Sequence, residues 1–197
     1  MSKIRAAKAE LRARLLRTRR GLTSDELRAA GAALATSVRE LPSLAAATTV
    51  AAYVSTGTEP DTHPMIDALR ESGTRVLLPV LLPDNDLDWA EYDGRAALEA
   101  TPRGLLEPAG AHLGPLAVAE AQAVLLPGLA VDRQGVRLGR GGGSYDRVLA
   151  RLAATGTHPA LVVVLYAHEV VETVPKEPHD HLVDAAMTPN GVQHFIR

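Results

Sequence analysis

A glycine-rich stretch that holds two arginines is the part of this sequence best suited to chemistry. Its residues are Arg137, Leu138, Gly139, Arg140, Gly141, Gly142 and Gly143, and Ser144 and Tyr145 follow directly. Glycines let backbone N–H groups approach an anion closely, and a helix N-terminus adds partial positive charge. Guanidinium groups bind phosphate oxygens through paired hydrogen bonds, so Arg137 and Arg140 would supply the formal charge. The stretch therefore predicts a phosphate site.

A carboxylate follows the glycines at Asp146. Negative charge beside bound phosphates is unfavourable unless a cation lies between them, so we expect Asp146 to bind magnesium, which prefers oxygen ligands. The alternative is that the glycines only form a turn and that Asp146 favours the dipole of the next helix. We prefer the phosphate interpretation, because two arginines would have no role in a plain turn.

Several familiar nucleotide and hydrolase patterns are missing. The chain has no Walker lysine pattern and no GxSxG elbow. Gly139 and Gly141 match the first two glycines of the dinucleotide pattern, but Ser144 stands where the third is required. The sequence therefore argues against a nicotinamide enzyme.

A second polar group, His179, Asp180, His181 and Asp184, lies near the C-terminus. Consecutive side chains of a strand point to opposite faces, which is poor geometry for one transition-metal site. A polar turn is the preferred interpretation. Asp180, with Asp184 as the weaker candidate, could still join Asp146 around magnesium.

The glycine stretch must be positioned by the elements on either side of it. An apolar run at 123–126 predicts a buried strand before it, and residues 145, 148, 149 and 152 have helical spacing after it. Ser144 is the expected N-cap of that helix. The order predicts a strand, a loop and a helix.

A βαβ unit is predicted earlier in the chain. A strand at Thr48–Val54 is followed by a helix at Thr62–Ser72 and a strand at Arg75–Val80. Such a unit implies parallel strands, with ligands at their carboxyl ends. Glu59 lies in one of these loops.

The remaining elements are predicted from shorter patterns. Thr23 and Glu26 have capping-box spacing, which predicts a helix to about Arg39. Residues 93–115 are rich in Gly, Pro and Ala and have the weakest pattern. Further strands are expected at Asp88–Tyr92, Pro159–Tyr166, Val171–Val174, Leu182–Met187 and Val192–Ile196.

Residues 3–20 carry eight basic residues against one acidic residue, and Ile4, Leu11 and Leu15 share one helical stripe. Four interpretations stay open: a solvated basic face, an organelle transit peptide, a nucleic-acid arm, or a helix that packs back and delivers Lys8 and Arg12 to the phosphates.

Composition predicts one globular domain spanning residues 1–197. The 46% hydrophobic content can form a sizeable core, and the net charge of −2 gives no general affinity for nucleic acid or an anionic membrane. The absence of cysteine excludes disulfides, thiolate metal sites and cysteine nucleophiles. We expect a cytoplasmic location and no membrane span.

With these features in order, the chain resembles the 5-formyltetrahydrofolate cyclo-ligase family. The central block is long and specific, and the resemblance spans nearly the whole chain. The matching segments are Lys8-Ala-Glu-Leu-Arg12, Tyr53 to Thr62 with Glu59, Leu78-Pro79-Val80, Glu107-Pro108, Pro127 to Arg147, and His179-Asp180 with Asp184 and Thr188.

The resemblance implies a three-layer α/β/α sandwich around a mainly parallel sheet. It implies ATP- and magnesium-dependent closure of 5-formyltetrahydrofolate to 5,10-methenyltetrahydrofolate, with release of ADP and phosphate. The partners would be a reduced folate and ATP, with no nucleic acid, in a monomer or weak homo-oligomer. In the family, the γ-phosphoryl group passes to the formyl oxygen, and the N10 nitrogen then closes the ring.

The resemblance also assigns roles to residues. Lys8 and Arg12 would bind the nucleotide phosphates, with Arg140 and Lys8 closest to the chemistry. The nucleotide loop would run from Arg137 to Tyr145. The substrate residues would be Glu59, Glu107, Arg140, Ser144 and Tyr145, and the magnesium residues Asp146, Asp180 and Asp184.

Three positions differ from the usual family pattern. Ser144 stands where the first of two tyrosines is common, Val131 where phenylalanine is usual, and Glu169 where glutamine is expected. Losing an aromatic face would remove about 1 kcal/mol of stacking with folate. A second hypothesis is therefore a relative with the same ATP site and another small substrate.

A third hypothesis is an anion- or RNA-binding module that uses the basic first helix. Its basic residues are not interleaved with aromatic residues, and the net charge is slightly negative. Both observations argue against it.

Overall fold

A seven-stranded sheet forms the centre of the computed structural model, which describes residues 3–178 and 180–195. The strands lie in the order β12-β11-β9-β6-β1-β2-β3. Neighbours from β11 to β2 are parallel, and the edge strands β3 and β12 are antiparallel. This confirms the predicted mainly parallel sheet. The bounds are β1 Thr49–Ala51, β2 Arg75–Leu81, β3 Leu87–Glu91, β6 Ala123–Pro127, β9 Ala160–Val164, β11 Ala185–Thr188 and β12 Gly191–His194.

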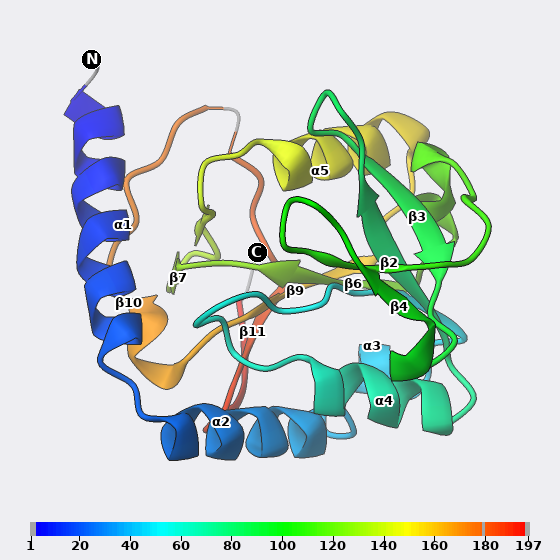
Figure 1. The fold of residues 1–197 in the computed structure, drawn as a ribbon. Coiled ribbons are helices and arrows are strands. Elements are labelled where there is room, and N and C mark those ends of the chain that lie inside the picture. Colours follow the sequence, from blue (N-terminus) through cyan, green and yellow to red (C-terminus); the bar gives the residue numbers. More distant parts are fainter. Residues whose placement is uncertain (1–2, 179, 196–197) are drawn as a thin grey trace.

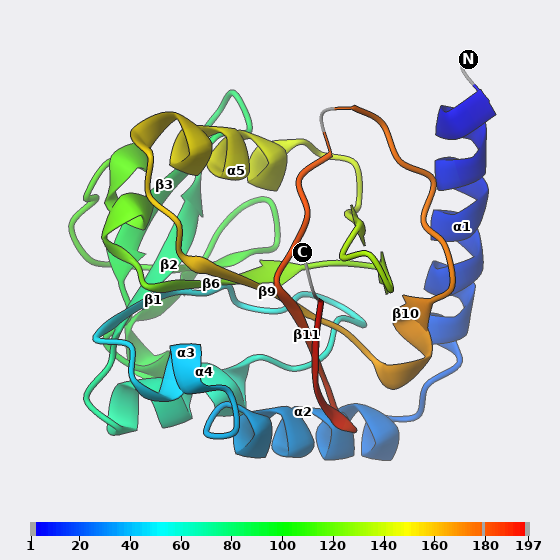
Figure 2. The same ribbon diagram turned by 180° about the vertical axis from the view of Figure 1, so that it is seen from behind.

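Helices cover both faces of this sheet (Figures 1 and 2). On one face lie α2 (Ser24–Ser37), α3 (Pro42–Ala45) and α4 (His63–Glu71), and on the other lies α5 (Ser144–Thr155). Each layer buries its own apolar cluster against the sheet, which is why the parallel strands are apolar on both faces. The three-layer α/β/α arrangement agrees with the prediction.

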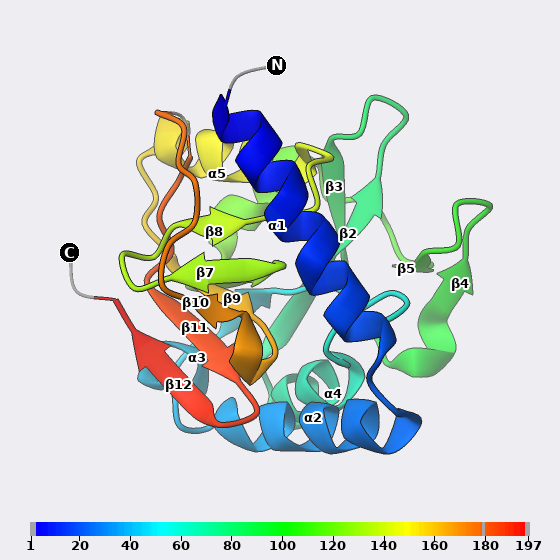
Figure 3. The ribbon, with the colours of Figure 1, turned by 90° about the vertical axis from the view of Figure 1, so that its left-hand side faces the viewer.

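The first helix, α1 (Lys3–Arg20), stands beside these layers and packs on a small second sheet (Figure 3). That sheet contains β7 (Ala130–Asp132), β8 (Arg137–Leu138) and β10 (Val170–Val171). Leu11 and Leu15 of α1 are buried there against Leu129, Ala130, Val136, Leu138 and Val174. Of the four interpretations of this helix, the structure shows packing against the rest of the chain. None of the described helices is long and apolar enough to cross a membrane.

The β7–β8 hairpin differs from the sequence prediction, which placed a loop directly after β6. The hairpin turn depends on Asp132, whose buried carboxylate accepts hydrogen bonds from the amides of Gln134, Val136 and Val174. Val174 is distant in sequence, so no local pattern marks this turn. A second correction concerns α5, whose N-cap is Gly143 and not Ser144.

Two shorter differences affect the site. β1 ends at Ala51 rather than Val54, and the last backbone bond to β2 is the one that the Ala52 amide donates to the Leu77 carbonyl, at 2.8 Å. The segment 93–115, with the weakest pattern, contains an antiparallel hairpin of β4 (Leu98–Ala100) and β5 (Leu106–Pro108). Short 3-10 turns occur at Arg95–Ala97, Pro115–Glu120 and Ala167–Glu169. The predicted strand at Val171–Val174 is the two-residue β10, and Ile196 lies outside the described residues.

Candidate active site

A cavity opens where the sheet topology changes direction. From β1 the chain continues through α4 to β2 on one side, and from β6 through α5 to β9 on the other. Such a switch point leaves a crevice beyond the carboxyl ends of the two strands. Tyr53 and Val54 line the cavity after β1, and Pro127 and Gly128 line it at the end of β6. Its volume is about 290 Å³.

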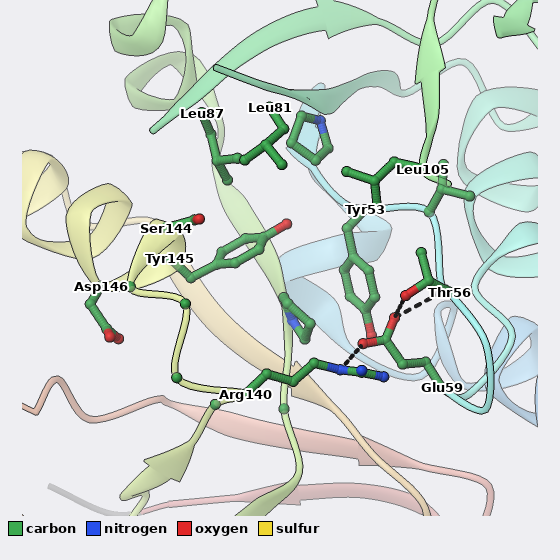
Figure 4. Close-up of a pocket in the computed structure, with 18 of the residues that line it drawn as sticks. Tyr53, Thr56, Glu59, Leu81, Leu87, Leu105, Arg140, Ser144, Tyr145 and Asp146 are labelled. Carbon is green, nitrogen blue, oxygen red and sulfur yellow. Dashed lines mark hydrogen bonds and ion pairs between the residues drawn. The ribbon is translucent and has the colours of Figure 1, made fainter. Parts of the chain in front are cut away.

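The cavity has an apolar side and a polar side (Figure 4). The apolar side combines Pro79, Leu81, Leu87, Leu105 and Leu106, from β2, β3 and the β4–β5 hairpin. The polar side combines Arg137, Gly139 to Gly143, Ser144 and Asp146. A flat apolar ring system and a charged group could therefore bind next to each other.

The glycine loop exposes its backbone toward the polar side. Gly141 and Gly143 have φ of 98° and 80°, a region that residues with a side chain rarely adopt. A Cβ atom on Gly141 would lie 3.6 Å from the guanidinium carbon of Arg12. The helix α5 begins at Ser144, and no side chain caps its first turn. The loop and the helix start thus form an anion-binding geometry.

Arg137 fixes positive charge in the wall of the cavity. Its side chain is 6% exposed and donates to the Pro127 carbonyl and to the Asp146 carboxylate, both at 2.9 Å. Its Nε is buried without a hydrogen-bond partner among the described residues. Burial lowers the pKa of Arg137, and the charge of Asp146 opposes that shift. An unpaired donor at this position suits an anionic ligand.

Glu59 lies across the cavity from the glycine loop and is bound from two sides. Its Oε2 accepts from the Thr56 amide at 2.8 Å, and its Oε1 is 3.0 Å from Nε of Arg140. The Glu59 side chain is 8% exposed, whereas that of Arg140 is 50% exposed. The ion pair therefore joins a buried carboxylate to a long, half-exposed arginine side chain across the site.

Two tyrosines, Tyr53 and Tyr145, line the cavity near enough to Glu59 to sense its charge. Burial, and then the charge of Glu59, raise the pKa of both Tyr53 and Tyr145 well above the usual range. Both hydroxyls thus keep their protons at neutral pH. The Tyr145 hydroxyl is buried with no partner among the described residues, which leaves it free to bond a ligand.

Of the two predicted residues of α1, Arg12 contacts the glycine loop, and neither Arg12 nor Lys8 lines the cavity. Nε of Arg12 donates to the Gly139 carbonyl at 2.8 Å. Lys8 is buried, and its Nζ is 2.7 Å from Asp180 and 3.0 Å from Glu177. Leu138 is buried in the β8 strand and also lies outside the lining.

The structure does not bring the three predicted metal carboxylates together. Asp146 lines the cavity described above, whereas Asp180 and Asp184 line a different one beside α5. Asp184 accepts from the Leu161 amide at 2.8 Å, at the amino end of β9 and so at the opposite edge of the sheet. No group of three metal-ligating side chains occurs within residues 3–178 and 180–195. His179 lies outside the described residues.

The other predicted substrate residues all line the cavity. Glu107 accepts from the Leu81 amide at 2.9 Å, so it also ties the β4–β5 hairpin to β2. Of the three departures from the family pattern, Ser144 alone lies in the described lining, because Val131 and Glu169 are buried elsewhere. Sequence reasoning did not identify the leucines of the apolar side, since their pattern is the same as that of core residues.

Comparison with known proteins agrees with this geometry. The 5-formyltetrahydrofolate cyclo-ligase of Mycolicibacterium smegmatis is 42% identical over 146 residues, which cover 72% of this chain and 73% of the relative. The 5-formyltetrahydrofolate cyclo-ligase of Escherichia coli is 35% identical over 178 residues, which cover 88% of this chain and 96% of the relative. Among solved structures, the 5,10-methenyltetrahydrofolate synthetase of Aquifex aeolicus has a TM-score of 0.80 at 27% identity, covering 96% of this chain and 93% of its own.

A family model extends the comparison to almost the full length. The model described as the 5-formyltetrahydrofolate cyclo-ligase family matches residues 4–189. That range includes α1 except its first residue, the glycine loop and the segment that holds Asp180. The match and the two curated relatives together show that the chain belongs to the 5-formyltetrahydrofolate cyclo-ligase family.

Proposed function

We propose that the chain catalyses the ATP-dependent closure of 5-formyltetrahydrofolate to 5,10-methenyltetrahydrofolate, with release of ADP and phosphate. The observation that carries the proposal is the position of Glu59, a buried carboxylate between an apolar wall and an arginine-glycine loop. A pterin ring fits against the apolar wall, and a phosphoryl group fits at the arginine-glycine loop. The names of the relatives support the same reaction.

The nucleotide phosphates would bind at the glycine loop. The positive φ values, the uncapped start of α5 and the unpaired Nε of Arg137 fit an anion there. Arg140 and Arg12 would neutralise further charge. Lys8 would join them only after leaving its ion pairs with Asp180 and Glu177, so we assign Lys8 first to holding α1 in place.

Magnesium would be bound at Asp146 and at the phosphates themselves. Asp146 is the predicted metal residue that lines the cavity, and its carboxylate is 61% exposed. Magnesium usually keeps water ligands and takes one or two carboxylates, so a single aspartate is sufficient for this mode. Asp180, paired with Lys8, would contribute at longer range.

The reduced folate would lie against the leucines, with Glu59 accepting hydrogen bonds from ring N–H groups. The uncharged Tyr145 hydroxyl would bond another polar atom of the ring, and Ser144 and Glu107 would border it. ATP supplies the phosphoryl group that turns the formyl oxygen into a leaving group. The chain contributes positioning and charge neutralisation, with Arg140 nearest to the transferred group.

A spectrophotometric assay tests the proposal. Absorbance of methenyltetrahydrofolate should appear only when the protein, ATP, magnesium and 5-formyltetrahydrofolate are all present. Omission of ATP, and addition of excess EDTA, should each abolish the signal. Failure of the complete mixture to form product would overturn the proposal.

A different small substrate is the second candidate, favoured by Ser144. This short side chain borders the apolar side where the family commonly has a tyrosine. If ATP hydrolysis is stimulated by another small amide or formyl compound more strongly than by 5-formyltetrahydrofolate, this candidate replaces the first. A monomer or weak homo-oligomer stays our prediction for the assembly.

A further inference from the structure

A buried ion pair lies behind the cavity and joins the first helix to the end of the main sheet. Arg19, in the last turn of α1, and Glu169, after β9, both have side chains with 0% exposure. Nε and Nη2 of Arg19 donate to the two carboxylate oxygens of Glu169, at 2.6 and 2.9 Å. The contact is therefore bidentate, the geometry in which arginine binds a carboxylate most specifically.

Arg19 also contacts the polypeptide that forms the cavity wall. Nη2 of Arg19 donates to the Gly128 carbonyl at 2.7 Å, and Gly128 lines the cavity. A Cβ atom on Gly128 would lie 2.6 Å from the Val163 side chain, so this backbone is pressed against β9. Arg19 thus fixes one wall segment from behind.

Tyr166 extends the contact to the opposite wall. Glu169 accepts from the Tyr166 amide at 3.0 Å, and the guanidinium of Arg19 lies 5.5 Å from the centre of the Tyr166 ring. The Tyr166 hydroxyl donates to the Thr58 carbonyl at 3.1 Å. Thr58 directly precedes Glu59, the residue that we expect to bind the folate. The bond from Tyr166 therefore fixes the backbone next to Glu59.

The energetics of the ion pair favour a role beyond stability. A fully buried pair gains little net stability, because the cost of removing both charges from water offsets their attraction. Burial lowers the pKa of Arg19, but the hydrogen bonds and charge of Glu169 outweigh it and raise that pKa overall. Arg19 therefore stays charged, and the pair remains locked in one geometry.

We propose that Arg19, Glu169 and Tyr166 form a positioning unit for the folate side of the site. The unit does not touch the substrate. It holds Gly128 and the Thr56–Glu59 turn at a fixed separation, so that Glu59 meets the ring at the correct distance. This inference deepens the proposed function and rests on it for its kinetic readout.

The sharpest test removes one hydroxyl. Tyr166→Phe deletes the bond to Thr58 but keeps the aromatic ring beside Arg19. We expect KM for 5-formyltetrahydrofolate to rise about 5-fold, with kcat and KM for ATP unchanged within about 2-fold. Tyr92→Phe is the matched control: it loses a bond of 2.6 Å to Asp67, outside the cavity lining, and should leave all three constants unchanged.

Arg19→Lys tests the bidentate contact, because lysine keeps the charge and loses the paired geometry. It should raise KM for the folate at least as much as Tyr166→Phe. Hydrogen exchange gives a readout that needs no activity: amides of residues 56–59 should exchange at least 5-fold faster in Tyr166→Phe than in Tyr92→Phe. This second measurement stands even if the proposed reaction is wrong.

Two results would overturn the positioning unit. One is equal exchange of residues 56–59 in the two tyrosine variants. The other is a parallel change of kcat and both KM values that follows the loss of melting temperature, which would indicate a merely structural role. Absence of product with the wild-type protein would instead refute the proposed function, and exchange alone would then decide the inference.

Discussion

The two sides of the cavity are built in opposite ways. The glycine loop has exposed backbone, two residues with positive φ and an arginine whose side chain is half exposed. The side that we propose for the folate has a nearly buried carboxylate, Glu59, which accepts from the Thr56 amide, while Tyr166 donates to the neighbouring Thr58 carbonyl. We expect the glycine loop to adapt to phosphates of different geometry and the fixed carboxylate to select one ring. We infer that adaptability and selectivity are divided between the two sides.

Replacing the arginine of the adaptable side should have the largest effect. Arg140→Ala removes charge next to the transferred phosphoryl group and should lower kcat about 100-fold. Its effect on melting temperature should be small, because the Arg140 side chain is half exposed and a solvent-exposed ion pair such as the one with Glu59 contributes little stability. Arg133→Ala, an exposed arginine outside the cavity lining, is the control for loss of charge. Loss of folding in Arg140→Ala would show that Arg140 is structural.

Glu59→Gln should separate the two sides. The amide keeps the shape but loses the charge that accepts from ring N–H groups, so KM for the folate should rise about 10-fold. KM for ATP should stay the same or fall, because Arg140 no longer has a competing carboxylate. Steady-state kinetics with each substrate varied in turn checks both values. A rise in both KM values would mean that the two sides are not independent.

Gly141→Ala should affect the adaptable side alone. A side chain at φ of 98° is strained by about 1 kcal/mol, although the added Cβ would make only ordinary contact with Arg12, at 3.6 Å. We expect KM for ATP to rise about 5-fold with KM for the folate unchanged. Gly142→Ala is the matched control, since its φ is not positive and an added Cβ meets nothing within 4 Å. Equal effects of the two substitutions would contradict the strain argument.

Ser144→Tyr should have the smallest effect and acts where the two sides meet. An added aromatic ring should stack on the folate and lower its KM about 3-fold, from about 0.7 kcal/mol of stacking. Isothermal titration with the folate measures the gain directly. Weaker binding would instead show that the cavity is shaped for a smaller or different substrate.

Local patterns in the sequence predicted the elements and part of the site. The capping box of α2 occurs as expected, with Thr23 and Glu26 bonding each other's backbone amides. The glycine loop, Glu59 and Asp146 meet at one cavity because parallel strands bring their carboxyl ends to one edge. The capping box and the meeting of these residues could be predicted because they follow from residue spacing and from the order of strands and helices along the chain.

The parts that sequence reasoning missed depend on contacts between distant residues. Asp180 has the residue type of a metal ligand, but its distance of 2.7 Å from Lys8 makes it first a partner of α1. Glu169 stands where the family pattern predicts glutamine. The structure explains the carboxylate, because the buried Arg19 pairs with it. The order of charges along the chain does not show which acidic residue will lie next to which basic residue in the folded structure.

The attachment of α1 has a consequence for how the chain reaches its native state. Lys8 pairs with Glu177 and Asp180, and Arg19 with Glu169, across separations of 169, 172 and 150 residues. Contacts this distant in sequence form late, because the entropy of closing so long a loop opposes them. During synthesis, Lys8 and Arg19 cannot be paired until residues 169–180 have been made. The glycine loop, which touches Arg12, is therefore completed among the final steps of folding.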